Sequence, residues 1–526
     1  ATTMINASWT NGLSSILRHH NKDLIATIGL VTPGTYGVAM YSSVTSCALV
    51  GVEPRPVRIE TTVSGGRAGF VIVGLPDTAI RESRERVKAA IRQSGFRFPR
   101  GQVVVNLSPA DLPKVGATYD LPIALSVLAA ASDRSLVFDE YVPVGELSLH
   151  GRVRPVRAAL GATVVAQQER KTCLLSSDTV VAMCGDSKVA GVATLREAVE
   201  VAQGRRVPES VREPEVGVLQ SPDLGDVRDQ HLARRALEVA AAGAHHLLLI
   251  GPPGAGKTML ARCLPSILPP LDGEHQRDVA LVWAAAGAER APSPEPPFRA
   301  PHHSSSLAAL VGGGSGVPTP GEVSKAHHGV LFLDELGEFP TSILDALRQP
   351  IEDGYLTVSR QAASVRFPAR LQLIAASNPC PCGYLGDRIT ACVCTDARRD
   401  RYTARLSGPL LDRFDMRIHL VRLRPSALVG GRGEPSAAVR ERVVAARRRQ
   451  RARGSLNSTL AGASLDEMTA GADAREALVA AAESAKLTAR GWDRVRRVAC
   501  TIADLEGVDT VDASHIAEAL LLRGET

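Results

Sequence analysis

The first half of the chain alternates short apolar runs with longer stretches of helical pattern, from about Val44 to about Val201. The runs are rich in β-branched residues, which favour strands. The predicted strands are Val57–Val63, Phe70–Val73 and Gln102–Leu107, and the predicted helices are Ala79–Ser94 and Leu121–Ala131. This alternation predicts an α/β domain. A stretch with Pro208, Pro214 and Pro222 in polar surroundings follows and is typical of a linker.

A second domain starts near Leu224. Its predicted elements are the helix Ala233–Ala242, the strand Leu247–Ile250, a helix from Lys257, and the strands Gly329–Leu333 and Leu371–Ala375. Short, fully apolar strands indicate a parallel sheet with helices on both faces. The Pro- and Gly-rich stretch from Pro292 to Pro320 indicates an insertion, and the helical Ala/Arg-rich pattern from about Pro435 indicates a small α-helical lid. The predicted fold class is therefore α/β, with an N-terminal α/β domain, a sheet sandwiched by helices, and a C-terminal helical lid.

Composition narrows the class of protein. Of the 526 residues, 44% are hydrophobic and 22% are charged, an ordinary globular mix, and the length predicts two to four domains. No apolar stretch reaches the ~18–20 residues of a membrane span, and the N-terminus lacks a secretory signal pattern, so we expect no membrane partner. The net charge of +6 permits a nucleic-acid partner. Residues 1–36 are polar and irregular, which predicts a weakly ordered N-terminal extension.

The segment after the strand Leu247–Ile250 has the pattern of a phosphate-binding loop, and it reads Gly251, Pro252, Pro253, Gly254, Ala255, Gly256, Lys257, Thr258. The glycines let the loop curl so that its amides point inward, and the following helix adds its positive N-terminal end. Lys257 would reach the β- and γ-phosphates, and Thr258 would hold Mg²⁺. The alternative is a Gly-rich turn with a surface lysine, but the strand–loop–helix context favours a site for ATP and Mg²⁺.

Two carboxylates follow the strand Val330–Leu333 directly. A buried strand that ends in Asp334 and Glu335 brings both to the carboxyl edge of the sheet, beside the phosphate loop. Asp334 would bind the Mg²⁺ shell, and Glu335 would orient and activate the attacking water. Acidic pairs after strands are common on loops, so it is the combination with the phosphate loop that carries this prediction.

Three further polar residues are candidates for the same site. The strand Leu371–Ala375 leads to Asn378, which either contacts the γ-phosphate or starts a turn before Pro379. A nucleotide hydrolase of this design also needs a cation to stabilise charge on the γ-phosphate. Arg413 and Arg490 are two candidates, although most arginines are solvated surface residues.

Four of the nine cysteines fall within fifteen residues, as Cys380, Cys382, Cys392 and Cys394. In a reducing cytoplasm, where we expect this protein, such a cluster favours a metal or redox site over disulfides. Four thiolates suit a tetrahedral, structural Zn²⁺. The C-x-C spacing is less usual than C-x-x-C, and the alternative is four reduced cysteines in an ordered loop.

Two histidine pairs, His302–His303 and His327–His328, also suggest a metal site. They flank the predicted insertion. The simpler interpretation is therefore that they face DNA or a subunit boundary.

Several segments resemble the Mg-chelatase-like AAA+ ATPases and, within them, the bacterial ComM (YifB) group. The matching segments lie at 73–83, 105–111, 119–123, 300–304, 320–323, 331–335, 378–383 and 406–415. They extend over residues 44–525 and leave only residues 1–36 outside. The resemblance implies a Lon-protease-like (ribosomal S5 domain 2-like) domain over 37–205, a linker over 206–223, an AAA+ core over 224–430 and a helical lid over 431–526.

The resemblance also implies an assembly and an activity. It implies a ring hexamer with the nucleotide between subunits, in which Arg413 is the finger that reaches a neighbour's γ-phosphate. Arg490 would act as the lid arginine in its own subunit's site, and Asn378 matches the first sensor position. The expected function is an ATP-dependent helicase or translocase that drives DNA branch migration in recombination or natural transformation.

The N-terminal domain departs from an active protease. A serine–lysine protease needs a hydroxyl nucleophile and a nearby lysine base. Thr118 stands near the nucleophile position, but the segment that leads to the Lon lysine continues here as Val156–Leu160 without a lysine. We therefore expect a catalytically dead, structural domain.

Contacts with DNA are predicted at Lys325 and Arg360, because both lie on inserted segments that line the channel in similar rings; each is equally an ordinary exposed charge. The arginine run Arg447–Arg453 is usually a solvated helix face. Two other functions stay open: a chelatase motor subunit, and a protein-remodelling ATPase that acts without DNA.

Overall fold

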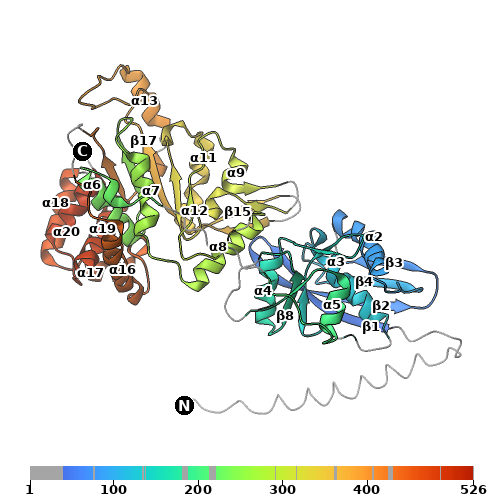
Figure 1. The fold of residues 1–526 in the computed structure, drawn as a ribbon. Coiled ribbons are helices and arrows are strands. Elements are labelled where there is room, and N and C mark those ends of the chain that lie inside the picture. Colours follow the sequence, from blue (N-terminus) through green and yellow to red (C-terminus); the bar gives the residue numbers. More distant parts are fainter. Residues whose placement is uncertain are drawn as a thin grey trace, which may run out of the picture.

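The computed structural model describes residues 40–524 apart from 75–76, 133–135, 137, 181–186, 212–220, 289, 291, 315–316, 361–363, 406–407, 424–430 and 486. The predicted extension over residues 1–36 lies outside the described residues, as does half of the predicted linker, residues 212–220. An N-terminal α/β part, a central core and a C-terminal group of helices follow one another along the chain (Figure 1). No described helix combines the length and the apolar character that a membrane crossing requires.

The N-terminal part is built on two sheets. Its elements are β1 (Met40–Val50), β2 (Glu53–Ser64), β3 (Gly69–Val73), α2 (Thr78–Gln93), β4 (Gln102–Ser108), η1 (Ala117–Tyr119), α3 (Asp120–Ala130), β5 (Tyr141–Pro143), β6 (Glu146–Leu147), β7 (Val153–Arg154), α4 (Ala159–Gln168), β8 (Thr172–Ser176), β9 (Lys188–Val192) and α5 (Leu195–Ala202). One sheet has the order β1-β2-β4-β3, the other is the parallel sheet β5-β8-β9, and β6 and β7 form a hairpin. Every second residue of β2 from Val57 to Val63 is buried, which is the alternation of a half-buried strand.

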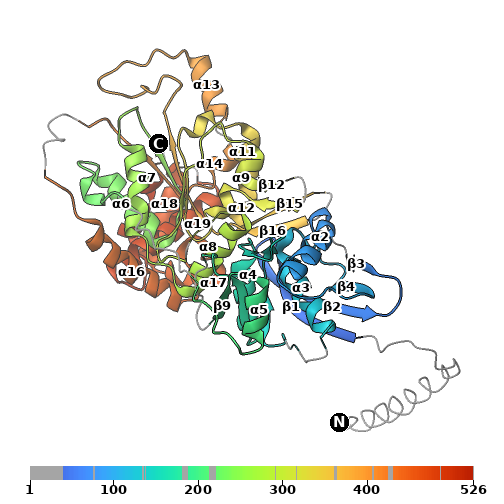
Figure 2. The ribbon, with the colours of Figure 1, turned by 45° about the vertical axis from the view of Figure 1, so that its right-hand side comes forward.

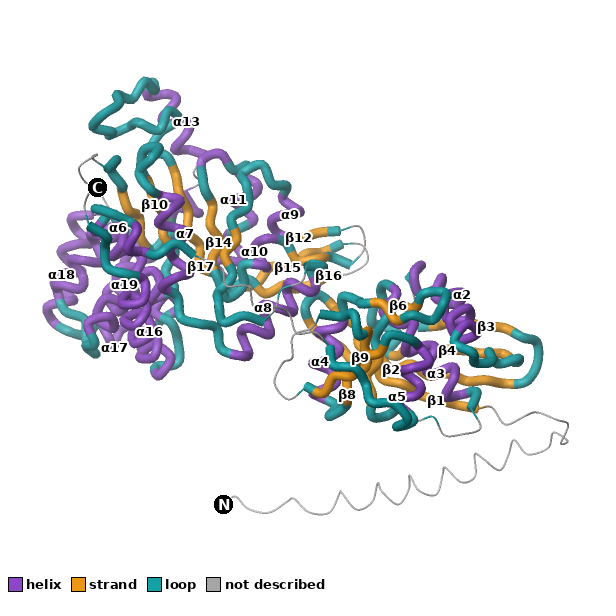
Figure 3. The backbone as a smooth tube through the Cα atoms, in the orientation of Figure 1, coloured by secondary structure: helices purple, strands orange, loops and turns teal. Residues whose placement is uncertain are grey.

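The core is a five-stranded sheet in the order β11-β14-β17-β10-β18, and each neighbouring pair is parallel. Its strands are β10 (Leu247–Ile250), β11 (Phe298–Arg299), β14 (Val330–Leu333), β17 (Gln372–Ser377) and β18 (Met416–His419). Helices cover the sheet (Figure 3), and the central strands are apolar at nearly every position because both faces are buried. The α/β fold class predicted from the sequence is confirmed. The predicted insertion Pro292–Pro320 is wrong in one respect, since β11 lies within it and pairs with β14 as an edge strand.

The remaining core elements surround this sheet. They are η2 (Leu224–Asp226), α6 (His231–Gly243), α7 (Lys257–Ile267), α8 (Gly273–Ala285), α9 (Leu307–Val311), β12 (Gly312–Gly313), β13 (Thr319–Pro320), α10 (Glu322–Lys325), η3 (Leu336–Glu338), α11 (Thr341–Ala346), α12 (Arg348–Asp353), β15 (Tyr355–Ser359), β16 (Ser364–Pro368), α13 (Asp396–Arg405) and α14 (Gly408–Leu411). Strands β12 and β13 form one hairpin, and β15 and β16 form another directly before β17. The loop that leads to α13 projects from the core (Figures 1 and 3).

The N-terminal part contacts the core through α8 and the β15–β16 hairpin. Figure 2 shows α8 beside α4, and Ala280 and Leu281 of α8 are buried in one cluster with Leu160 of α4. At Gly51, in the turn between β1 and β2, an added Cβ would lie 2.4 Å from Cγ1 of Val365 in β16. The backbone of the turn therefore lies directly against the hairpin.

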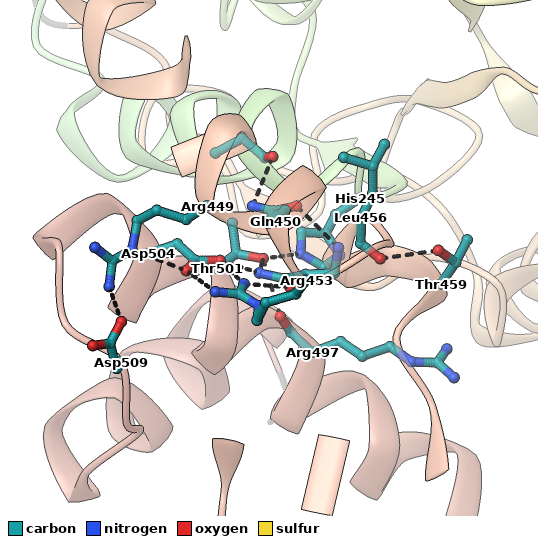
Figure 4. Close-up of polar contacts among 12 residues, drawn as sticks. His245, Arg449, Gln450, Arg453, Leu456, Thr459, Arg497, Thr501, Asp504 and Asp509 are labelled. Atoms are coloured by element: carbon teal, nitrogen blue, oxygen red, sulfur yellow. Dashed lines mark hydrogen bonds and ion pairs between the residues drawn. The ribbon is translucent and has the colours of Figure 1, made fainter. Parts of the chain in front are cut away.

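The C-terminal group consists of α16 (Ser436–Ala452), η4 (Asn457–Thr459), α17 (Gly462–Met468), α18 (Ala472–Ala485), α19 (Ala489–Glu506) and α20 (Ala513–Arg523). Its helices share one hydrophobic cluster with α6 and α7 of the core, which includes Leu237, Val443 and Val498. Beneath this cluster lies a buried polar network (Figure 4). The helical lid predicted from the sequence is thus packed onto the core. The exact bounds of the predicted domains stay predictions.

Asp504 is the centre of that network (Figure 4). Its side chain has no exposed surface, and its two oxygens accept hydrogen bonds from Arg453 at 2.8 and 2.5 Å. Asn457 Nδ2 donates to it at 2.7 Å, and Arg449 Nε lies 3.5 Å away. Because a buried charge that loses its partner is costly, Asp504 holds α16, η4 and α19 together.

We predict that Asp504→Ala lowers the free energy of unfolding of the lid by about 3–5 kcal/mol, because Arg453 would stay half-buried without its counter-charge. Asp509→Ala is the matched control. Asp509 pairs with Arg449 as well, but its side chain is 92% exposed, so its loss should cost about 1 kcal/mol or less. Denaturant unfolding followed by circular dichroism compares the two variants, and equal effects would contradict the role of Asp504.

Candidate functional site

The glycine-rich loop 251–256 connects the inner strand β10 to helix α7. Gly254 and Gly256 have φ angles of 77° and 87°, a conformation that side-chain-bearing residues rarely adopt. A Cβ added to either glycine would meet no atom within 4 Å, so both border open space. Helix α7 begins at Lys257, directly after the loop, and the unpaired N–H groups of its first turn add to those of the loop. This arrangement suits an anion such as a phosphate.

Lys257 lies where the loop meets the neighbouring strand. Its Nζ donates to the carbonyls of Gly251 and Pro252 at 2.6 and 3.1 Å, and to Asn378 Oδ1 at 3.1 Å. Asn378 follows β17, whose Ser377 is the register partner of Ile250 in β10. Burial lowers the pKa of Lys257, although the nearby carboxylates oppose this shift. The parallel register therefore brings together the predicted lysine and the predicted sensor.

Thr258 and Asp334 meet on the other side of the loop. Thr258 Oγ1 donates to Asp334 Oδ2 at 2.7 Å, across 76 residues of sequence. Mg²⁺ prefers hard oxygen ligands and is usually held by one or two carboxylates together with substrate phosphates. A hydroxyl and a carboxylate oxygen that converge beside a phosphate loop fit this ion.

Glu335 has an unusual backbone. Its φ of 53° is in the left-handed region, although it is not a glycine, and such residues often lie at functional sites. Its carboxylate is about half exposed and lies 3.3 Å from Nδ1 of His303. A carboxylate with access to solvent, one residue from Asp334, can orient a water molecule next to the loop.

His303 was not predicted as a member of this site. It lies in the loop after the edge strand β11, and its ring contacts that of Phe339 edge-on at 6.4 Å between centroids. The sequence placed it at the border of an insertion. No pattern in the neighbouring sequence predicts the contact of His303 with Glu335, because this contact depends on the pairing of β11 with β14.

The two candidate arginines differ in their surroundings. The side chain of Arg413 is 9% exposed and forms an ion pair with Glu352 Oε1 at 2.5 Å, on α12. Arg490 is exposed in the first turn of α19. Their roles at the nucleotide site stay predictions.

The four clustered cysteines come together at the base of the projecting loop. Sγ of Cys380 lies 3.4 Å from that of Cys382 and 3.6 Å from that of Cys392, and Cys382 and Cys392 are 3.5 Å apart. The sulfur of Cys394 joins them within 4.8 Å. Around a tetrahedral zinc with Zn–S bonds of 2.3 Å, sulfurs are about 3.8 Å apart. A hydrogen bond from the backbone of Tyr384 lowers the pKa of Cys382 to about 6, which favours its thiolate, whereas burial raises the pKa of Cys394.

This cysteine loop also contacts the phosphate loop. A Cβ added to Gly383, whose φ is 85°, would lie 2.8 Å from Cδ of Pro253 and 3.8 Å from Cγ of Asn378. Only a residue without a side chain fits there. The fold of the cysteine loop is therefore coupled to the shape of the nucleotide site.

The two predicted DNA contacts differ in their surroundings. Arg360 is exposed at the end of β15, and one of its guanidinium nitrogens lies 3.4 Å from where a Cβ on Gly313 would be, so the two hairpins adjoin. Lys325 is half-buried, and its Nζ pairs with Glu322 at 3.2 Å. Of the two, Arg360 has the more accessible charge.

Thr118, near the predicted protease nucleophile position, is almost fully buried. It lines a cavity of about 400 Å³ between the N-terminal part and core residues such as Val317 and Thr319. The nearest lysine in sequence, Lys114, is also buried, and its Nζ donates to the carbonyl of Pro109. Among the described residues, no hydrogen bond joins Thr118 to a lysine. The absence of protease activity stays a prediction.

The pair His327–His328 does not behave as expected from the sequence. His327 is 4% exposed, so it does not face DNA or another subunit. Its Nδ1 accepts a hydrogen bond from the backbone N–H of Arg370 at 3.0 Å. In the neutral ring the other nitrogen then carries the proton. Neither nitrogen is available to a metal, even though Asp278 and His328 are close by.

These features together define the class of protein. A phosphate loop leads from an inner strand of a parallel sheet, a lysine and a hydroxyl begin the next helix, and a carboxylate pair ends a nearby strand. This is the core of a P-loop ATPase of the AAA+ type. Residues 223–428 match the family described as magnesium chelatase, subunit ChlI. Residues 59–179 match subunit ChlI of Mg-chelatase, and residues 433–523 match its C-terminal family.

Full-length relatives refine the family. The chain is 42% identical over 496 residues to an uncharacterized protein of Mycobacterium tuberculosis, covering 91% of this chain and 97% of that one. It is 41% identical over 494 residues to YifB of Salmonella typhimurium (90% and 96%) and 40% identical over 492 residues to competence protein ComM of Haemophilus influenzae (90% and 96%). The chain belongs to the YifB/ComM group of Mg-chelatase-like AAA+ ATPases.

Asp334→Asn should weaken the Mg²⁺-dependent part of ATP binding by about tenfold or more, because even indirect partners of a metal ligand contribute about 10–100-fold to metal affinity. Binding of a fluorescent ATP analogue with and without Mg²⁺ measures this. The control is Asp345→Asn, whose carboxylate pairs only locally with Arg348 on the neighbouring helix. If Asp334→Asn keeps the full Mg²⁺ effect, the assignment of Asp334 is wrong.

Proposed function

We propose that this chain is a subunit of a ring-shaped, hexameric ATPase that moves along DNA and drives branch migration. The observation that carries the proposal is the convergence of Lys257 with Asn378, and of Thr258 with Asp334, at one edge of the parallel sheet. Both pairs join residues more than seventy positions apart in the sequence. An arrangement of this kind serves phosphoryl transfer from ATP to water.

The proposed mechanism uses positioning and charge. The loop amides and Lys257 bind the phosphates, and Thr258 and Asp334 hold Mg²⁺. When bound, the ion neutralises charge that develops on the phosphate oxygens. Glu335 orients the attacking water and accepts its proton, while His303, 3.3 Å away, holds that carboxylate in place. Asn378 contacts the γ-phosphate side of the site.

The surroundings of Arg413 support the proposal of a ring-shaped assembly. Phosphoryl transfer needs a cation at the γ-phosphate, and within one chain the ion pair of Arg413 is with Glu352 of α12. We infer that it serves the site of a neighbouring subunit. Arg490, on the lid, serves the site of its own subunit.

The action on DNA rests on two kinds of support. One relative that matches over nearly its whole length is named a competence protein, and the family resemblance of this chain implies branch migration. In addition, Arg360 provides an exposed charge beside two adjacent hairpins of the core. Contacts of such arginines with phosphates would be strongly salt-dependent.

Two alternative functions predict a different response of ATP hydrolysis to DNA. The family description names a magnesium chelatase subunit, and a protein-remodelling ATPase would use the N-terminal part to bind clients. Neither alternative requires DNA.

We predict that four-way or forked DNA raises the rate of ATP hydrolysis several-fold over the rate without DNA. We also predict that Glu335→Gln lowers kcat by at least about 100-fold while ATP stays bound, since a positioned base contributes about 10²–10⁴-fold. Steady-state hydrolysis with branched, double-stranded and single-stranded DNA, together with gel filtration in a non-hydrolysed ATP analogue, measures turnover and assembly. A flat response to every DNA form excludes the DNA motor and leaves the two alternatives. Unchanged turnover in Glu335→Gln would refute the role of that residue.

We also propose that the four clustered cysteines hold a structural zinc. The donor set fits, because the three measured sulfur separations are close to those of a tetrahedral site. All four positions around the metal would be filled by protein, so it would have no catalytic role. Through Gly383 the site would keep the loop against Pro253.

The purified protein should contain one zinc per chain, and Cys382→Ser/Cys394→Ser should contain none. Elemental analysis measures this. Because the loop contacts Pro253 and Asn378, we expect the double variant to bind ATP more weakly as well. Cys500→Ala, which replaces a buried cysteine of the lid, should keep both properties. Wild-type protein without zinc after purification in the absence of chelators would contradict the assignment.

A further inference from the structure

The segment that carries Arg413 is held by buried polar contacts from the lid. The carbonyl of Phe414 accepts a hydrogen bond from Arg494 Nη1 at 3.2 Å, and Arg494 Nε lies 3.7 Å from Asp415 Oδ1. The side chains of Arg494 and Asp415 are 14% and 7% exposed, and Phe414 is fully buried. Charges that are withdrawn from water are costly to separate. Arg494 therefore ties the backbone next to Arg413 to helix α19.

Two adjacent histidines before β10 contact the second carboxylate oxygen of Asp415. The backbone N–H of His246 donates to Asp415 Oδ2 at 3.0 Å, and Nδ1 of His245 lies 3.4 Å from the same oxygen. Burial raises the pKa of Asp415, but the polar groups around its carboxylate, with the guanidinium of Arg494 among them, hold that pKa below its ordinary value. His245 Nε2 in turn shares a hydrogen bond of 2.7 Å with Thr501 on α19. Asp415 is thus an ionised group clamped between the core and the lid.

We propose that Arg494 is a positioning residue for Arg413, joining this arginine to the helix whose first turn carries Arg490. The proposal rests on the roles assigned above to Arg413 and Arg490. Arg490 and Arg494 are four residues apart on α19, about 6 Å along the helix. A movement of the lid that follows the nucleotide in one subunit therefore shifts the arginine that this subunit presents to its neighbour. Arg494 touches no nucleotide itself.

Mixed rings separate an action on the neighbour from an action within the subunit. The test measures ATP hydrolysis of Arg494→Met, alone and mixed with an excess of Glu335→Gln subunits, which do not hydrolyse ATP but retain an intact Arg413. Arg494→Met alone should have a kcat at least tenfold lower, with a KM for ATP within twofold of wild type, since a misplaced finger removes an interaction made in the transition state. In the mixture the kcat per Arg494→Met subunit should recover, because its site then meets a correctly held Arg413.

Arg413→Ala, mixed in the same way, is the reference. If Arg413→Ala recovers and Arg494→Met does not, Arg494 acts within its own subunit and the inference is overturned while the proposed function stands. If neither recovers, Arg413 does not act on a neighbour, and the proposed function fails with it. If Arg494→Met alone hydrolyses ATP at the wild-type rate, the inference is also overturned.

Two further variants control for folding. Arg496→Met removes another arginine of α19 with a side chain that is 12% exposed, but its partners Asp466 and Thr469 belong to the lid. It should keep a kcat close to wild type. Arg494→Lys keeps a charge and a donor, so it should retain more activity than Arg494→Met. If Arg494→Met does not fold, the mixing experiment is made with Arg494→Lys, and a loss of kcat there that the mixture does not restore overturns the inference.

Discussion

The parallel register of β10, β14 and β17 is the constraint on which the site depends. Because neighbouring parallel strands end at the same edge of a sheet, residues that follow them converge regardless of their distance in sequence. Ile250 pairs with Ser377 and Leu333 with Ala375. This register brings Asn378 to Lys257 and Asp334 to Thr258. A shift by one residue would turn each side chain away and separate both pairs.

The sequence predicts the parts of the site that are local. The phosphate loop is one continuous segment, and the carboxylates and Asn378 directly follow apolar strands, so a strand prediction also predicts where they lie. The sequence does not predict His303, Glu352 or the contacts of Asp415. Each of these depends on a distant partner, and its own neighbours in the chain carry no signal of that partner. The edge strand β11 was missed for a related reason, since two residues among prolines have no detectable strand pattern.

The lid is attached by charges as well as by apolar packing. Hydrophobic contacts alone tolerate small sliding movements, because apolar packing has little directional preference. The buried contacts of Asp504 and Asp415 are directional, and each requires specific donors. The contacts of Asp504 hold α19 against α16 and η4 within the lid, and those of Asp415 with Arg494 and His246 orient α19 relative to β10 and β18. The helix that carries Arg490 is thereby joined to the segment around Arg413.

The N-terminal part contacts elements of the core that differ from those proposed to bind the nucleotide. Its contacts are made with α8 and the β15–β16 hairpin, through residues such as Leu281 and Val365. The phosphate loop and the carboxylates lie at the ends of the sheet strands. The same hairpin has the exposed Arg360 at the end of β15. This hairpin contacts both parts of the chain, because its buried side chains share one hydrophobic cluster with β14 and β17 while Val365 also lies against Gly51. The buried Thr118 lines the cavity at this contact, together with core residues such as Val317.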